Sequence, residues 1–379
     1  MSKPKIRFKG YEEDWEQRKL SEIATMHARI GWQNLRTSEF LDSGDYMLIT
    51  GTDFEDGTIN YSTCHYVEKE RYEQDKNIQI RNGSILITKD GTLGKVAYVQ
   101  GLTMPATLNA GVFNVEIKDK KETDEKYLFQ YLKAPFLMDY VTRHATGGTI
   151  KHLNQSILIN FPVYMPKKSE QEKIGLYLMQ LDSLITLHQR KCEETKKLKK
   201  YMLQKMFPQN GKRVPEIRFA GFTDDWEQRK LSDVVDSVDT GKSKFDKEGS
   251  SGEYPILGST SVIGYDDEYD YEGDFILTAR VGANAGSLYR HAGKVKISDN
   301  TVFIQASQNI EFLYQLLIRF DIKRLSFGTG QPLVKASELK RLELMMPTDM
   351  EEQMRIGVYF KNLDHLITLH QRQYQKLFQ

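Results

Sequence analysis

Cysteine is scarce in this sequence of 379 residues, which contains only Cys64 and Cys192. Two cysteines so far apart are too few for a thiolate metal site and do not form a disulfide framework. Proline is also scarce, with 10 residues, and charged residues make up 28% of the chain, which argues against disorder. No apolar run reaches the length of a membrane span, and the first residues, MSKPKIRFKG, lack the apolar core of a signal peptide. We therefore expect a soluble, cytoplasmic protein without a membrane segment.

Recognisable catalytic and cofactor-binding motifs are missing as well. The stretch TGKS at 240–243 resembles the end of a phosphate-binding P-loop, but the pattern requires a glycine where this chain has Asp236. A carboxylate at that place would repel a bound phosphate. The Glu-x-Lys spacing of metal-dependent nucleases occurs at 338–340 without an upstream Pro-Asp pair. We therefore expect no catalytic residues, no cofactor and no metal site.

The sequence does contain a long internal repeat. IRFKGYEEDWEQRKLSEI at 6–23 returns as IRFAGFTDDWEQRKLSDV at 217–234, with an unbroken WEQRKLS in both copies. SEQEKIGLYLMQLDSLITLHQR at 169–190 returns as EEQMRIGVYFKNLDHLITLHQR at 351–372. The length of the chain predicts two or more domains, and a repeat of this kind predicts two halves built on one plan.

The segments between these near-copies have diverged. GSILITKDGTLGKVAYV at 83–99 is matched by GDFILTARVGANAGSLY at 273–289, and in each a short β-prone run is followed by a glycine-containing turn. YLFQYLKAPFLMDYV at 127–141 and FLYQLLIRF at 312–320 have helical spacing. The fold class is therefore expected to be mixed α/β (α+β), with two similar globular domains.

Each half ends in a segment with the pattern of a long helix. Ser169 is a candidate N-cap, and Pro208 with Gly211 ends the first helix. Seven-residue periodicity with 4-3 spacing is typical of a coiled-coil seam rather than of an ordinary surface helix. The expected seam residues are Ile174, Leu178, Leu181, Ile185 and His188 in the first helix and Ile356, Phe360, Leu363, Ile367 and His370 in the second. At 1.5 Å per residue the first helix would be roughly 58 Å long.

Two polar features of these helices have more than one explanation. His188 and His370 occupy equivalent seam positions, where they could bind a metal or set the register of the pairing. We favour register, because neither has Asp, Glu or Cys at metal-ligand spacing. Between Arg190 and Arg213 there are nine lysines and arginines and only two glutamates. A solvated helix face is the simplest explanation of such a charge run.

Glycine-containing loops recur at matching places in the two halves. Glycine lets a backbone approach a surface closely, and Lys, Arg, Asn, Gln and Thr bond phosphates or base edges. An ordinary turn explains any one of these loops, but their recurrence makes DNA contact an equal alternative. The candidate DNA-binding residues are Lys89, Thr92, Lys95, Thr149 and Lys151 in the first half and Arg280, Asn284, Thr329, Gln331 and Lys335 in the second.

The order of these features resembles the DNA specificity subunit of type I restriction-modification enzymes. The resemblance is carried by the W-x-x-x-x-L-S phrases at 15–21 and 226–232, the loops TGGT and GTGQ, and Glu-Gln-x-x-Ile at the start of each long helix. It covers essentially the whole chain. No single motif is specific, but the order occurs twice.

The resemblance implies two target-recognition domains separated by two long antiparallel coiled-coil helices, with an internal pseudo-twofold axis. Each domain would read one half of a bipartite, asymmetric site in double-stranded DNA. Two modification subunits, which are adenine methyltransferases, would dock on the repeated framework, and restriction/translocase subunits would join through them. The expected boundaries are 1–168 and 217–349 for the target-recognition domains, 169–207 and 350–379 for the spacer helices, and 208–216 for the linker.

Two other functions remain as alternatives. A stand-alone DNA methyltransferase or nuclease would bind adenosylmethionine or ATP without a partner. A coiled-coil adaptor with no role in DNA binding would show none of the salt-dependent affinity that phosphate contacts produce.

Overall fold

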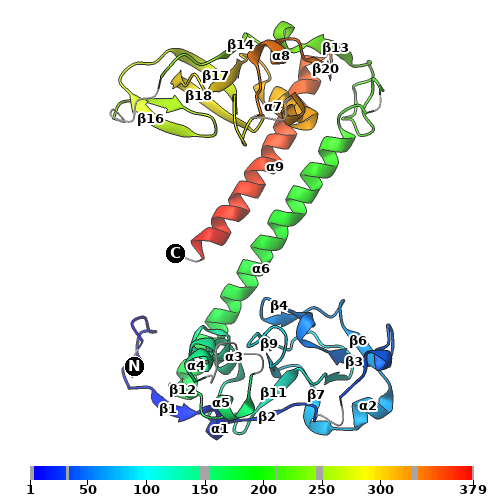
Figure 1. Cartoon of the computed structure of the whole chain (residues 1–379), viewed down its shortest axis with the longest axis vertical. Coiled ribbons are helices and arrows are strands. Elements are labelled where there is room, and N and C mark those ends of the chain that lie inside the picture. Colours follow the sequence, from blue (N-terminus) through cyan, green and yellow to red (C-terminus); the bar gives the residue numbers. More distant parts are fainter. Residues whose placement is uncertain are drawn as a thin grey trace. The chain divides into compact units, whose positions relative to one another are not determined.

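The computed structural model describes residues 4–30, 34–144, 153–209, 211–244, 251–325 and 332–377. The chain divides into two compact units, Met1–Leu184 and Ile185–Gln379. Each unit is a mixed body of helices and strands (Figure 1), which confirms the expected fold class. None of the described helices combines the length and the apolar character needed to cross a lipid bilayer.

The first unit contains two four-stranded sheets, with the strand orders β2-β11-β8-β9 and β6-β3-β10-β7. The strands are β2 (Ala24–His27), β3 (Tyr46–Ile49), β6 (His65–Val67), β7 (Gln79–Ile80), β8 (Ile85–Thr88), β9 (Val96–Tyr98), β10 (Ala106–Leu108) and β11 (Val112–Ile117). Side chains alternate between the two faces of a strand. In β8, Ile85 and Ile87 therefore join one core, while Leu86 joins the core of the second sheet. A short pair, β4 (Phe54–Glu55) and β5 (Thr58–Ile59), completes these strands.

The helices of the first unit are short, except for the one that leaves it. They are α1 (Leu20–Ile23), α2 (Lys69–Glu73), α3 (Glu125–Lys133), α4 (Phe136–His144) and α5 (Gln155–Leu158), with 3-10 turns at Thr37–Glu39, Gly51–Asp53 and Lys76–Ile78. The expected single helical run at 127–141 is two helices, α3 and α4. The break falls where Pro135 forces Ala134 into an extended conformation.

The second unit contains one six-stranded sheet with the order β14-β19-β17-β18-β15-β16. Its strands are β14 (Ser237–Thr240), β15 (Tyr254–Leu257), β16 (Val262–Asp266), β17 (Tyr271–Ala279), β18 (Leu288–Ile297) and β19 (Thr301–Gln305). The first four strands in this order repeat the antiparallel arrangement β2-β11-β8-β9 of the first unit. Helices α7 (Ile310–Phe320) and α8 (Ala336–Lys340) and 3-10 turns at Leu231–Asp233 and Ile322–Leu325 accompany the sheet.

The repeated WEQRKLS phrase forms the same strand in both units. β1 (Glu16–Lys19) pairs antiparallel with β12 (Pro162–Met165), and β13 (Glu227–Lys230) pairs in the same way with β20 (Glu343–Met346). The strands β12 and β20 lead into the two long helices, α6 (Lys168–Lys205) and α9 (Met350–Lys376). The repeated phrase therefore holds the strand from which each long helix starts.

A buried ion pair ties the residues before each phrase to the start of the helix. The Arg7 guanidinium donates from Nε and Nη2 to the two oxygens of Glu170 at 2.7 and 2.8 Å. Arg218 and Glu352 repeat this bidentate pair at the same two distances. Both glutamate side chains are 1% exposed. The Glu of the Glu-Gln-x-x-Ile motif is thus a structural residue in both copies.

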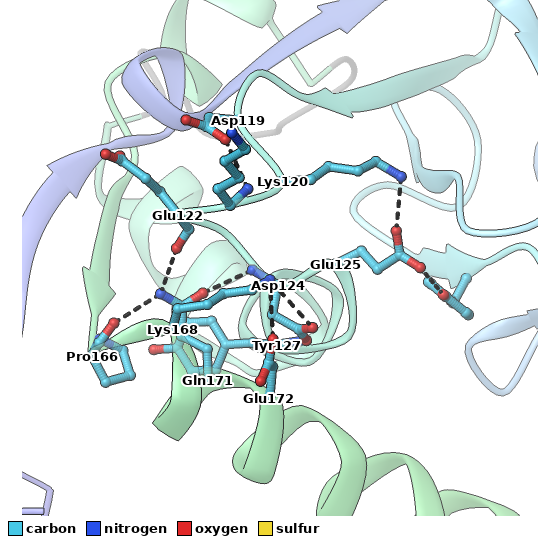
Figure 2. A network of polar contacts seen from close by, with 12 residues as sticks. Asp119, Lys120, Glu122, Asp124, Glu125, Tyr127, Pro166, Lys168, Gln171 and Glu172 are labelled. Atoms are coloured by element: carbon cyan, nitrogen blue, oxygen red, sulfur yellow. Dashed lines mark hydrogen bonds and ion pairs between the residues drawn. The ribbon is translucent and has the colours of Figure 1, made fainter.

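The Gln of the same motif closes the junction between strand, helix and body (Figure 2). The Gln171 amide nitrogen donates to the carbonyl oxygens of Pro166 and Glu122, at 2.8 and 3.0 Å, and its oxygen accepts from the backbone N–H of Asp124. Asp124 in turn caps α3 by accepting from the Tyr127 N–H. In the second unit Gln353 donates to the Pro347 carbonyl at 2.8 Å and accepts from the Asn309 side chain.

A glycine in each long helix permits the close approach of a body helix. A Cβ on Gly175 would lie 2.6 Å from the backbone nitrogen of Tyr127 in α3, and one on Gly357 would lie 2.8 Å from that of Phe312 in α7. Such distances are shorter than side chains tolerate, so only glycine fits. The crossing is held further along by equivalent bonds, from Gln130 to Asp182 and from Gln315 to Asp364.

Within the second unit, α6 and α9 pack antiparallel (Figure 1). Lys199 Nζ lies 2.6 Å from Asp364 Oδ1, and Nδ1 of His188 lies 3.4 Å from Nδ1 of His370. Moving forward along α6 therefore means moving backward along α9. Ile185 and Ile367, also expected on the seam, are half-buried.

The first turns of the long helices pack on the bodies. Ile174 contacts the core of the first unit, and Ile356, Phe360 and Leu363 belong to the main core of the second. Leu178 and Leu181 are half-buried. The expected N-cap at Ser169 is wrong, because α6 begins at Lys168 and Ser169 lies inside its first turn.

Candidate nucleic-acid interface

Lys89 and Arg280 occupy equivalent places, each directly after the central strand of its sheet. The N–H of Lys89 donates to the Gly111 carbonyl at 2.8 Å, and that of Arg280 donates to the Asn300 carbonyl at 2.9 Å. The carbonyl of Lys89 accepts from the Leu153 N–H, as that of Arg280 does from the Val334 N–H. In each unit, the first residue of the loop after this strand is thus bonded to Leu153 or Val334, which lie in the second pair of segments that the sequence matches between the halves.

The side chains at these two places differ in exposure. The Lys89 side chain is half-buried, with its Nζ 5.5 Å from the centre of the Phe113 ring. Arg280 is exposed. A guanidinium that reaches solvent can bond a phosphate or the edge of a guanine. Arg280 is therefore the better placed of the two for contact with DNA.

The rest of the first loop carries Thr92 and Lys95, which are both exposed. Gly91 and Gly94 adopt φ of +73° and +71°, which only glycine adopts readily. The Thr92 hydroxyl donates to the Gly51 carbonyl at 3.4 Å, so the loop contacts the turn that follows β3.

In the second unit, Asn284 is exposed on the loop after β17, and Lys335 lies at the start of α8. The two segments are joined by a bond of 3.1 Å from the Gly282 N–H to the Pro332 carbonyl. Lys335 Nζ is 3.7 Å from Glu338 Oε1, and both side chains are exposed, so this pair holds the lysine only weakly. The predicted residues Thr149, Lys151, Thr329 and Gln331 lie outside the described residues.

One segment at this end of the second sheet escaped the sequence analysis. The rejected P-loop stretch continues β14 as Gly241–Lys244, where the Ser243 N–H donates to the Ile297 carbonyl and the Asp299 N–H donates to the Ser243 carbonyl. Lys242 and Lys244 are exposed beside it. The sequence analysis rejected a nucleotide site here and assigned no role to Lys242 and Lys244. The position of this stretch directly after a strand could have indicated that both lysines lie at the end of the sheet.

A second candidate surface lies on the long helices. Large apolar side chains there are between 37% and 48% exposed, at positions that repeat with a shift of 182 residues. We call these the apolar stripes; they consist of Leu176, Leu184 and Leu187 on α6 and Val358, Leu366 and Leu369 on α9.

In the parts of the chain that the structure describes, no three His, Cys, Asp or Glu side chains gather as metal ligands.

Comparison with known proteins agrees with this architecture. The family model of the type I restriction modification DNA specificity domain matches residues 12–197 and 223–379. The MjaVIII specificity subunit and the putative MjaX specificity subunit, both type I restriction enzyme subunits of Methanocaldococcus jannaschii, are each 24% identical to this chain. Their alignments cover 96% of this chain and 93% and 90% of the relatives. The type I restriction-modification S subunit from M. genitalium has the same fold, with a TM-score of 0.70, 16% identity and coverage of 99% of this chain and 96% of that one.

Two matched regions that together span most of the chain define its class. The chain belongs to the family of type I restriction-modification DNA specificity subunits, which are non-catalytic DNA-recognition subunits. Such subunits work in an assembly with the other subunits of the restriction-modification system.

Proposed function

We propose that this chain selects the DNA sequence on which a type I restriction-modification complex acts, by binding a bipartite, asymmetric site of which each unit reads one half. The observation that carries the proposal is that the loops after β8 and β17 lie at equivalent ends of the two sheets. There, Lys89 and Arg280 form backbone hydrogen bonds with partners at equivalent positions, while the side chains around them differ between the units. Equivalent placement with different side chains suits two readers of two different short sequences.

The apolar stripes support the docking of two modification subunits, and through them of the restriction/translocase subunits. Five exposed leucines and one exposed valine at equivalent positions of two helices offer two similar surfaces to two copies of one partner. Such side chains on a long helix suit packing against helices of a partner. As part of the same proposal, residues 1–168 and 217–349 are the two target-recognition domains, 169–207 and 350–379 are the spacer helices, and 208–216 is the linker.

Methylation mapping tests the proposal. The chain, combined with its modification subunits, should methylate adenine within one motif made of two short words and a gap. Exchange of residues 235–345 for the corresponding body of another family member should alter one word only. A change in both words, or in neither, would contradict the assignment of one half-site to each unit.

Arg280→Ala gives a finer test within one half-site. If Arg280 contacts a base, its loss should cost about 1–3 kcal/mol of binding to the second half-site and relax the preference at one position. Lys340→Ala, which removes another exposed cation of the second unit, serves as the control. Equal effects of the two substitutions would show that Arg280 acts only through its charge.

A further inference from the structure

The second unit carries an exposed hairpin that lies outside the repeated plan. Strands β15 and β16 extend its sheet beyond β18, whereas the corresponding sheet of the first unit ends at β9. We define the hairpin tip as Gly258–Ile263. Thr260, Ser261, Val262 and Ile263 are all exposed there, and the two apolar side chains are 38% and 37% exposed. Two hydroxyls therefore lie beside two aliphatic side chains at the tip.

The hairpin tip lies next to the loop that carries Arg280. The Asn300 carbonyl oxygen accepts from the Arg280 N–H at 2.9 Å and from the Ser259 hydroxyl at 3.3 Å. Two residues before Asn300, the Ser298 N–H donates to the carbonyl of Leu257, the residue directly before the tip, at 2.9 Å. Arg280 and the hairpin tip therefore share one anchoring turn, residues 298–300.

The tip is held in one conformation by its own contacts. The Gly258 N–H donates to the Ser261 carbonyl at 2.8 Å, and the Tyr289 hydroxyl donates to the Gly258 carbonyl. A Cβ on Gly258 would lie 2.4 Å from Ile263 Cγ2, so glycine lets the aliphatic side chain fold over the turn. These bonds use backbone groups of the tip and leave the side chains of Thr260 and Val262 facing solvent. A surface ordered in advance loses little entropy when it binds.

Lys242 and Lys244 lie on the other side of the same anchoring turn. Ser243 is bonded to Ile297 and Asp299, while Leu257 is bonded to Ser298, so the lysine segment and the hairpin tip flank residues 297–299. Two strand spacings put the backbones of Ser243 and Leu257 about 10 Å apart. The major groove is about 12 Å wide, so long lysine side chains at this separation can reach the phosphates beside a groove that the tip enters. One carboxylate lies beside this segment: Asp270 accepts from the Ser243 hydroxyl at 2.7 Å.

We propose that the hairpin tip enters the major groove and reads base edges of the half-site bound by the second unit, while Lys242 and Lys244 bind phosphates of the flanking backbone. This inference rests on the proposed function. The major groove admits a two-stranded β-ribbon, hydroxyls bond donors and acceptors of any base pair, and aliphatic side chains contact the thymine methyl group. Ammonium groups bind phosphates without regard to sequence.

Base reading and phosphate binding predict different effects, so we test each with its own double variant in the assembled complex. The probes are labelled duplexes that contain the methylated motif, either intact or with one base pair of the second word replaced. With T260A/S261A, discrimination between intact and altered duplexes should fall about fivefold or more, and the salt dependence of binding should stay unchanged. With K242A/K244A, affinity for all duplexes should fall together, and the slope of log K against log salt should decrease by about 1–2.

The control is S307A/Q308A, which removes two exposed polar side chains beyond the opposite end of β19. If the T260A/S261A variant shows no cooperative thermal unfolding, T260V replaces it, because valine keeps the shape of the side chain and removes its hydroxyl. A hairpin variant that discriminates as well as the control would overturn this inference alone, as would an unchanged salt slope for the lysine variant. A wild-type complex that binds all duplexes equally would instead overturn the proposed function, and this inference with it.

Discussion

Replacing Glu352 by glutamine tests whether the repeated Arg–Glu pair holds each long helix to its body. The Glu352 side chain is 1% exposed and both of its oxygens accept from Arg218. Removing one partner of a buried pair costs about 3–5 kcal/mol, because the other charge stays buried and unpaired. Arg218 keeps its bond to the Asp224 carbonyl, and glutamine can accept one of the two lost bonds. We therefore expect a loss of about 3 kcal/mol in the free energy of unfolding, at the lower end of that range.

The neighbouring carboxylate provides a matched control. Glu351 is 55% exposed and pairs with Arg355 one turn away, so Glu351→Gln should cost no more than about 0.5 kcal/mol. Urea unfolding followed by tryptophan fluorescence measures both, since Trp226 is buried in the core of the second unit. The double variant R218M/E352Q should recover part of the loss, because no uncompensated charge remains. If E352Q and E351Q differ by less than 0.5 kcal/mol, the buried pair does not secure the helix.

Three further predictions concern other parts of the two units. Gly357→Ala should lower the free energy of unfolding of the second unit by about 1–3 kcal/mol in urea titrations, because its Cβ would meet the backbone of α7; a neutral result would mean that the crossing can widen. Leu184→Glu and Leu366→Glu, on the two apolar stripes, should each cost the complex one modification subunit in native mass spectrometry, and loss of both copies from either variant would contradict two separate docking surfaces. The thiol of Cys64 should react with a thiol reagent only upon unfolding, because burial raises its pKa to about 12 and the side chain is 8% exposed; rapid labelling of the folded chain would refute this.

The long helices could be predicted from the sequence, but their surroundings could not. The 4-3 spacing identifies one covered stripe on each helix, and a body core covers such a stripe as well as a partner helix does. Ile174 and Ile356 accordingly pack on the bodies, while His188 and His370 lie side by side at the far end of the same pattern. Periodicity reports that a face is buried and gives no information about what buries it.

The contacts of the repeated motifs were also beyond sequence reasoning, although their signal was present. Arg7 is 163 residues from Glu170, and only folding brings them together. Gly175 and Gly357 stand at the same place in both copies, and a glycine inside a helix costs about 1 kcal/mol relative to alanine. A repeated cost of that kind indicates a close contact. The sequence does not say with which element.

The chemistry of the loop ends depends on details that a loop pattern does not contain. The recurrence of the loops correctly pairs the segments around Lys89 and Arg280, because both follow a central strand. Whether the side chain reaches solvent depends on its neighbours, and the aromatic ring of Phe113 lies beside Lys89. No spacing rule encodes that difference.

The way in which contacts are distributed explains why the ends of the two halves are near-copies while their middles differ. At the start of each long helix an ion pair joins two side chains, as between Arg218 and Glu352, so a change of one residue requires a matching change of the other. At the loop ends, segments are held by backbone groups, such as the carbonyls of Arg280 and Asn300, which every residue possesses. Side chains there can be replaced without loss of the bonds that position them. If each unit reads one DNA word, as we propose, a chain built in this way can change that word without disturbing the contacts at the start of the long helices.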